Sequence, residues 1–165
     1  MPALTAGKAA PEFTLPDMSG DQFDLREALS RGPVLAVFFK ISCPVCQFTL
    51  PYIERIYQAY AGKNVSIVAI SQNNKNDTAA FMREYKITMP VLLDDTGTYP
   101  VSNAYGLTNV PTSFWIERDG EIGLSSVGWN RRDVDQVNRL IAETGGSAAA
   151  PIFSPGETVP DYRPG

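Results

Sequence analysis

Short apolar runs alternate along this chain with stretches of helical periodicity. The apolar, β-branched runs are too short to be separate helices and predict strands. They lie at residues 33–39, 65–71, 90–93, 112–117 and 122–127. Apolar positions that recur every three or four residues predict helices at 44–61, 77–85, 98–105 and 133–143. Because a strand–helix–strand unit crosses over right-handed and places its strands parallel, the pattern predicts an α/β fold.

The two ends of the chain differ from this central pattern. Residues 7–30 contain two short extended segments, 10–15 and 23–25, on either side of the turn residues 17–21, and a helical turn follows at 26–30. The cap of the helix at 77–85 is assigned to Asp77 or Thr78. Residues 145–165 are rich in Ala, Pro and Gly and lack periodicity, which predicts an extended or disordered tail unless it docks. We therefore expect one domain, residues 1–144, followed by a tail, residues 145–165.

Composition restricts the classes of function. The chain has 165 residues and a net charge of −4, with 44% hydrophobic and 19% charged residues, as in a globular protein. A pI near 4.8 and the lack of a basic stripe argue against nucleic acid as a partner. No apolar run approaches the roughly 18 residues of a transmembrane helix. The N-terminus shows no basic start followed by an apolar stretch, so a cytoplasmic location is expected, or an exported one if a leader has been removed.

The chemistry centres on the only two cysteines, Cys43 and Cys46. They follow a predicted strand directly and stand at the start of a predicted helix. Exposed N–H groups and the macrodipole at a helix N-terminus stabilise a thiolate. Cys43 is therefore the expected nucleophile, and Cys46, one turn further, the thiol that resolves a mixed disulfide.

Other interpretations of this pair are a structural disulfide or buried apolar filling. A disulfide across two intervening residues constrains the unfolded chain little. A structural zinc site usually needs four ligands, and this chain has no histidine. A metal site at Asp94 and Asp95 is disfavoured as well, because adjacent carboxylates beside Gly97 are more typical of a solvated turn. No metal and no cofactor are expected, and redox chemistry is favoured.

At this point the chain resembles a known family. Cys43-Pro44-Val45-Cys46 with Pro51 five residues later resembles the active-site helix of thioredoxin-like proteins, and residues 109–120 are similar to their V-P-T segment. Residues 68–71 and 89–94 look like the TlpA-type and alkyl-hydroperoxide-reductase/thiol-specific-antioxidant branch. The resemblance covers about residues 7–143. It implies a thioredoxin-like α/β domain with a mixed central sheet, helices on both faces and an N-terminal β-hairpin.

The resemblance also implies roles for residues outside the cysteine pair. The Val110–Pro111 bond is expected to be cis and to face the cysteines, with Val110, Pro111, Pro44 and Val45 lining a groove for protein substrates. The implied reaction is thiol–disulfide exchange with protein thiols and disulfides, sustained by an unidentified thiol donor. Two alternatives stay open: a peroxiredoxin-like peroxide reductase, and a binding protein whose cysteines are inactive.

The chain departs from the family pattern at several positions. The buried acid of thioredoxins is replaced by Val37, and the position after the strand at 65–71 offers only amides, so no general base for Cys46 is evident. Lys40 could serve as that base or stabilise the Cys43 thiolate by charge, or it could be a solvated lysine. Lys40 and Ala36 also occupy the Thr/Ser and Pro positions of the P-x-x-x-[T/S]-x-x-C peroxidase motif, which weakens the peroxide-reductase alternative.

Overall fold

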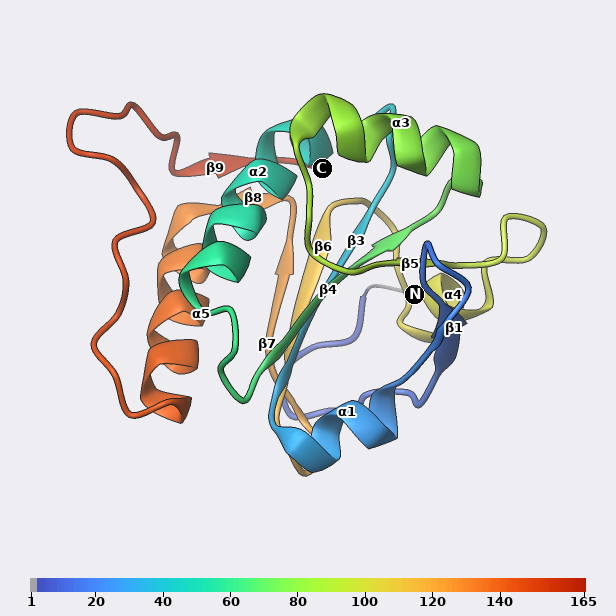
Figure 1. The fold of residues 1–165 in the computed structure, drawn as a ribbon, viewed down its shortest axis with the longest axis horizontal. Helices are drawn as coiled ribbons and strands as arrows, with labels where there is room; N and C mark the ends of the chain where they lie inside the picture. Colours follow the sequence, from blue (N-terminus) through green and yellow to red (C-terminus); the bar gives the residue numbers. More distant parts are fainter. Residues whose placement is uncertain (1–2) are drawn as a thin grey trace.

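A mixed five-stranded sheet forms the centre of the protein, which a computed structural model describes over residues 3–165. Its strand order is β5-β4-β3-β6-β7 (Figure 1). The strands are β3 (Val34–Phe39), β4 (Ser66–Ser71), β5 (Val91–Leu93), β6 (Thr112–Ile116) and β7 (Ile122–Val127). β3, β4 and β5 run parallel, whereas β6 is antiparallel to β3 and β7. All five strands were predicted from their apolar runs.

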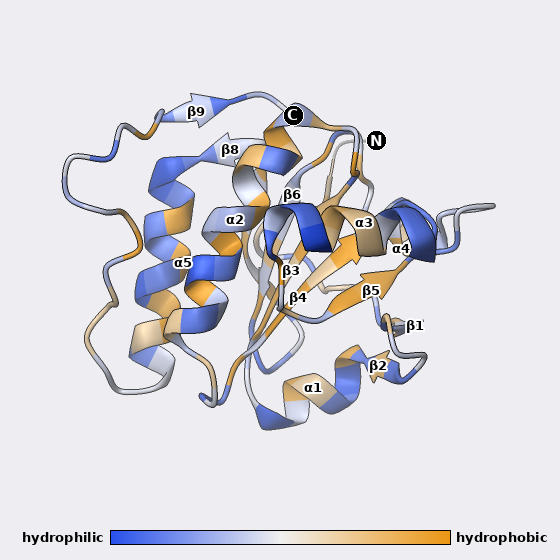
Figure 2. Cartoon of the chain, turned by 45° about the horizontal axis from the view of Figure 1, so that its top comes forward, coloured by the Kyte–Doolittle hydropathy of each residue, from blue (hydrophilic) through white to orange (hydrophobic). Residues whose placement is uncertain are grey.

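Helices cover both faces of the sheet. One face carries α2 (Pro44–Ala59), α3 (Lys75–Tyr85) and α5 (Arg131–Thr144), and the other carries α1 (Leu25–Arg31) and α4 (Pro100–Ala104). The central strand β3 serves both cores, because successive side chains point to opposite faces. Leu35, Val37 and Phe39 pack toward α2, while the three residues alternating with them pack toward α1. Figure 2 shows the resulting apolar sheet beneath helices whose outer faces are hydrophilic. The predicted α/β, thioredoxin-like fold class is confirmed.

The N-terminal extension forms the expected hairpin. β1 (Thr14–Pro16) pairs antiparallel with β2 (Gln22–Asp24), and Asp24 then caps α1 by accepting the Arg26 N–H at 2.9 Å. Phe13 and Leu15 are buried in the core on the α1 side. The hairpin therefore covers one face of the sheet and lies away from the cysteines.

Two helices begin earlier than expected. Asn74, not Asp77 or Thr78, caps α3, because its Oδ1 accepts the Asp77 N–H at 2.8 Å. Asn130 caps α5 in the same way, with the Asp133 N–H at 3.2 Å. Asparagine is as good an N-cap as aspartate. The predicted cap of α3 was therefore wrong, although both predicted helices exist.

The segment after α5 is docked on the domain. It leaves the end of α5, passes along the outer side of that helix and returns across the top of the molecule (Figure 1). There β9 (Tyr162–Arg163) pairs antiparallel with β8 (Trp129–Asn130). Ile152 and Val159 are buried in the same core as α2. The segment thus takes the docked form, while the division at residue 144 stays a prediction.

Two further features of residues 3–165 bear on partners. In this part of the chain, no helix combines the length and the apolar character needed to cross a bilayer. The same residues contain no group of three or more Cys, Asp or Glu side chains arranged to hold a metal ion.

Candidate active site

Cys43 occupies the N-cap of the long helix α2. Its backbone is extended, with φ −86° and ψ 116°, and Pro44 fills the first helical position. The Cys43 Sγ accepts the backbone N–H of Cys46 at 3.2 Å. A sulfur that receives an N–H at a helix N-terminus is placed where negative charge is stabilised. Cys43 is also partly accessible, which a nucleophile requires.

Cys46 lies one turn further along α2 and is fully buried. It belongs to the apolar core that includes Val37 and Leu50. Burial raises the pKa of the Cys46 thiol above its ordinary value, and its contact with Cys43 adds to that effect. Among residues 3–165, no carboxylate forms a hydrogen bond with either cysteine. No carboxylate partner for Cys46 is therefore seen in this part of the chain, in agreement with the sequence, where no acidic base for Cys46 was evident.

A cis Val110–Pro111 peptide bond faces the cysteines, as expected. The Cys43 thiol donates to the Val110 carbonyl oxygen at 3.4 Å, although 67 residues separate the two in sequence. Pro111 is itself tied down, because the Gly128 N–H donates to its carbonyl oxygen at 2.7 Å. The structure thus brings Cys43, Cys46, Val110 and Pro111 together at one end of the sheet.

The remaining predicted site residues surround this centre. Pro44 is exposed and Val45 half-buried on the first turn of α2. Lys40 is exposed and lines an open groove of about 180 Å³ together with Gln72 and residues 107–110. Its charge opposes the effect of burial on the Cys46 pKa. Lys40 therefore lies near enough to influence the pair.

Three comparisons place this geometry among known proteins. The model of the AhpC/TSA family matches residues 6–125. The chain belongs to the AhpC/TSA family. Thiol-disulfide oxidoreductase ResA from Halalkalibacterium halodurans is 33% identical over 138 residues, covering 82% of this chain and 77% of ResA. Within the family, the chain is thus similar to thiol–disulfide oxidoreductases, and the prediction of that enzyme class is confirmed.

Solved structures of two kinds share the fold. The thioredoxin domain of a thiol-disulfide oxidoreductase from Bacteroides vulgatus superposes with a TM-score of 0.74 at 22% identity, covering 84% of this chain and 99% of that domain. Peroxidoxin BcpB from Mycobacterium tuberculosis superposes with a TM-score of 0.63 at 25% identity, covering 74% and 85%. The fold therefore accommodates both chemistries, and the residues around Cys43 must distinguish them.

Two side chains that position the active-site loop were not predicted from the sequence. Asn73 Oδ1 accepts the Ile41 N–H at 3.0 Å, and the Gln47 amide donates to the Ile41 carbonyl oxygen at 2.9 Å. Both backbone groups of Ile41 are thereby held just before Cys43. Asn73 is one of the three amide residues, 72–74, that directly follow β4. This position directly after β4 is the signal from which the role of Asn73 could have been predicted.

The prediction of a solvated turn at Asp94 is wrong. Asp94 is 2% exposed, and its carboxylate accepts the N–H groups of Val101 and Ser102 and the Ser102 hydroxyl, at 3.3, 2.8 and 2.7 Å. It therefore anchors the start of α4, whereas Asp95 is exposed as expected. Ser102 in turn accepts from Gln72, which lines the groove beside Lys40. The buried carboxylate thus supports one wall of the site.

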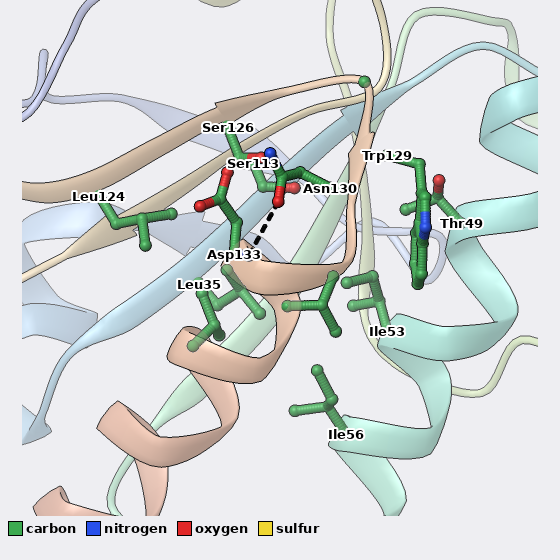
Figure 3. A pocket seen from close by; sticks show the side chains of 13 residues that line it. Leu35, Thr49, Ile53, Ile56, Ser113, Leu124, Ser126, Trp129, Asn130 and Asp133 are labelled. Atoms are coloured by element: carbon green, nitrogen blue, oxygen red, sulfur yellow. Dashed lines mark hydrogen bonds between the residues drawn. The ribbon is translucent and has the colours of Figure 1, made fainter. Parts of the chain in front are cut away.

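A small cavity lies between the sheet, α2 and α5, behind the active-site helix. Its volume is about 20 Å³, which is room for roughly one water molecule. Figure 3 shows Leu35, Ile53 and Ile56 around it, with Asp133 at one side and Thr49 beside Trp129. Neither cysteine lines this cavity, so it is distinct from the catalytic site.

Proposed function

We propose that this protein exchanges disulfides with protein substrates, with Cys43 as the attacking thiol and Cys46 as the resolving thiol. The observation that carries this proposal is the position of the Cys43 sulfur. It lies between the N-terminus of α2, through the Cys46 N–H, and the carbonyl group of Val110. Val110 and Pro111 form the edge against which an extended substrate segment lies, and Pro44 and Val45 border it.

The reaction proceeds through a mixed disulfide. The Cys43 thiolate attacks one sulfur of the substrate disulfide, the substrate S–S bond breaks, and one substrate thiolate leaves and takes up a proton. Cys46 then gives up its proton and attacks the Cys43 sulfur, which releases the second substrate thiolate. The substrate gains two electrons, and the protein retains a Cys43–Cys46 disulfide. An external dithiol must reduce that disulfide before the next turnover, and the same steps in reverse oxidise a substrate.

The burial of Cys46 supports Cys43 as the first nucleophile and Cys46 as the second. A thiol with a raised pKa is a poor first nucleophile at neutral pH, because little thiolate is present. Once Cys43 is held in a mixed disulfide, however, Cys46 is already beside its target. Lys40 supplies a positive charge that favours the Cys46 thiolate formed in that second step. The cytoplasmic location stays a prediction.

Peroxide reduction is the second candidate, because Peroxidoxin BcpB shares the fold. A peroxidase must orient the peroxide and stabilise the departing oxygen, and such placement is commonly worth several kcal/mol of barrier. The motif that would supply the orienting hydroxyl holds Lys40 instead, and Lys40 is exposed. Disulfide exchange needs only the two thiols and an accessible edge, so it is favoured.

One experiment separates the two candidates. Reduction of insulin disulfides and consumption of hydrogen peroxide are measured on the same reduced preparation, with Cys43→Ser as the blank. We expect Cys43-dependent insulin reduction to be much faster than Cys43-dependent peroxide consumption. Rapid peroxide consumption with little insulin reduction would move the protein to the peroxide-reductase class. Equal rates for wild type and Cys43→Ser in both assays would support an inactive binding protein.

A further inference from the structure

Side-chain contacts with α2 hold the docked tail before it reaches the active site. Arg55 on α2 donates to both carboxylate oxygens of Glu157, at 2.8 and 2.9 Å, and the Tyr52 hydroxyl donates to the same carboxylate at 3.1 Å. Phe153 packs against the ring of Tyr52, 5.5 Å between centroids. The segment that follows is therefore fixed in position relative to the active-site helix.

Residues 162 and 163 pair with β8, and Gly165 lies directly against the cis-proline edge. Gly165 approaches the Val110 carbonyl oxygen so closely that a Cβ atom there would collide with it. The Asn109 amide also donates to the Gly165 carbonyl oxygen at 3.3 Å. A Cβ atom at Gly128, whose φ is +76°, would likewise collide with the backbone carbonyl oxygen of Arg163. Because Val110 accepts from Cys43, the end of the described chain forms a wall of the catalytic site.

Arg163 presents a free guanidinium on this wall. Its guanidinium carbon lies 4.5 Å from the ring centre of Phe48, two residues after Cys46 on α2. Stacking on an aromatic ring orients a guanidinium while leaving its N–H edge available. Within residues 3–165, the Arg163 side chain forms no hydrogen bond and no ion pair. It is therefore positioned to bind a carboxylate that comes from outside the chain.

The surface beside Arg163 also carries arginines that form no ion pair with any of the residues described. An open groove of about 560 Å³ adjoins β9 and is lined by three arginines of α5 and two carboxylates, namely Arg131, Arg132, Arg139, Asp135 and Asp161. None of these arginines takes part in an ion pair within the described part of the chain. On a protein of net charge −4, this face carries a local excess of positive charge. Tyr162, an apolar side chain that is 56% exposed, lines the same groove.

We propose that residues 162–165 form a specificity wall of the substrate site, and that Arg163 selects substrates with an acidic residue close to the attacked cysteine. This inference rests on the proposed disulfide exchange. The planar guanidinium suits a carboxylate in two-point contact. Phe48, on which Arg163 stacks, follows Cys43 by five residues on α2, a rise of about 7.5 Å. An extended substrate rises about 3.3 Å per residue, so the selected acid lies roughly two to four residues from its cysteine. The family match ends at residue 125, so the wall is built from sequence outside it.

The test compares three peptides under one assay. Each is a disulfide-linked homodimer with one cysteine, and the positions two and three residues from it are both Glu, both Gln or both Lys. The release of peptide thiol by the reduced protein gives kcat/KM for each. We expect the Glu peptide to react on the order of tenfold faster than the Lys peptide at low salt, with a smaller ratio at high salt. Arg163→Glu should reverse this order, and Arg163→Gln should abolish it.

Controls make each outcome decisive. Arg83→Glu makes the same charge change on α3, at an exposed arginine whose groove is lined by none of the proposed site residues, and should keep the wild-type order. Equal Cys43-dependent rates for the three peptides would overturn the wall proposal while leaving disulfide exchange intact. A uniform acceleration of all three peptides by Arg163→Glu would also overturn it, because Arg163 would then obstruct every substrate and select none. Loss of Cys43-dependent exchange with every peptide would instead refute the proposed function.

Discussion

Glu54 provides a quantitative test of how the active-site helix is anchored. It lies on α2, is 8% exposed, and its carboxylate accepts four hydrogen bonds. Oε1 accepts the backbone N–H groups of Thr88 and Met89, both at 2.9 Å. Oε2 accepts the Thr88 hydroxyl at 2.6 Å and the Gln58 amide at 2.7 Å. One side chain therefore ties the helix that carries the cysteines to the segment leading into β5.

The bonds set the size of the expected effect. Replacing Glu54 by Ala leaves the buried Met89 N–H and the partly buried Thr88 N–H without this acceptor. A fully buried N–H without an acceptor costs about 1–3 kcal/mol, and a partly buried one costs less because water reaches it. We expect Glu54→Ala to lower the free energy of unfolding by about 3 kcal/mol, and Glu54→Gln, which keeps one oxygen, by about 1–2 kcal/mol. Glu84→Gln, an exposed carboxylate on α3, is the matched control and should change little.

The effect should depend on pH with a definite sign. Burial alone raises the pKa of Glu54, but the hydrogen bonds from Thr88, Gln58 and Met89 outweigh it and hold the pKa below its usual value. The stabilisation is therefore complete above the unfolded-state value of about 4.3 and is lost as the pH falls toward the folded-state pKa. Urea unfolding, followed by tryptophan fluorescence at pH 7 and near pH 3, measures the gap between wild type and Glu54→Gln. An unchanged stability in Glu54→Ala at pH 7, or a gap that does not shrink in acid, refutes the reasoning.

Two further predictions concern the packing around the site. Thr49 is buried and its hydroxyl has no hydrogen-bond partner among the residues described, so Thr49→Val should leave the urea midpoint unchanged or raise stability by up to about 1 kcal/mol; a clear loss would contradict this. The Arg55 guanidinium lowers the pKa of Glu157 to about 2, so docking of the tail should persist above about pH 4.5 and weaken as the pH falls toward 2. Faster hydrogen exchange of residues 152–163 should show this loosening, and Glu157→Gln should show it already at pH 7. Equal protection of these residues in the variant and the wild type would contradict a role of the Arg55–Glu157 ion pair in docking the tail.

The elements that could be predicted from the sequence are those decided by neighbouring residues. The buried strand before Cys43 has six consecutive apolar residues, and the helix after it repeats apolar positions with the period of its own turns. The V-P-T segment carried enough family resemblance to place a cis-proline opposite the cysteines. These signals lie within short windows, which is why they predicted both the fold and the centre of the site.

What the sequence did not disclose depends on distant partners. Glu54 reads as part of a solvated helix face, yet it accepts from Thr88, 34 residues away. Asp94 looks like a turn residue because its partner Ser102 belongs to the following helix. The tail shows no periodicity, and its docking rests on side-chain contacts such as that between Arg55 and Glu157, 102 residues apart. Periodicity carries no information on such pairs, since each residue alone is typical of a surface.

The most direct test of the central claim is the identity of the cysteine that bonds to substrate. Cys46→Ser leaves the attacking thiol in place and removes the resolving one, so the reaction should stop at the mixed disulfide. After incubation with insulin, we expect a covalent adduct of Cys46→Ser that dithiothreitol releases, and mass spectrometry should locate it at Cys43. Cys43→Ser should give no adduct under the same conditions, because Cys46 is buried. An adduct on Cys46 in Cys43→Ser, or none on Cys43 in Cys46→Ser, would contradict the assignment of Cys43 as the nucleophile.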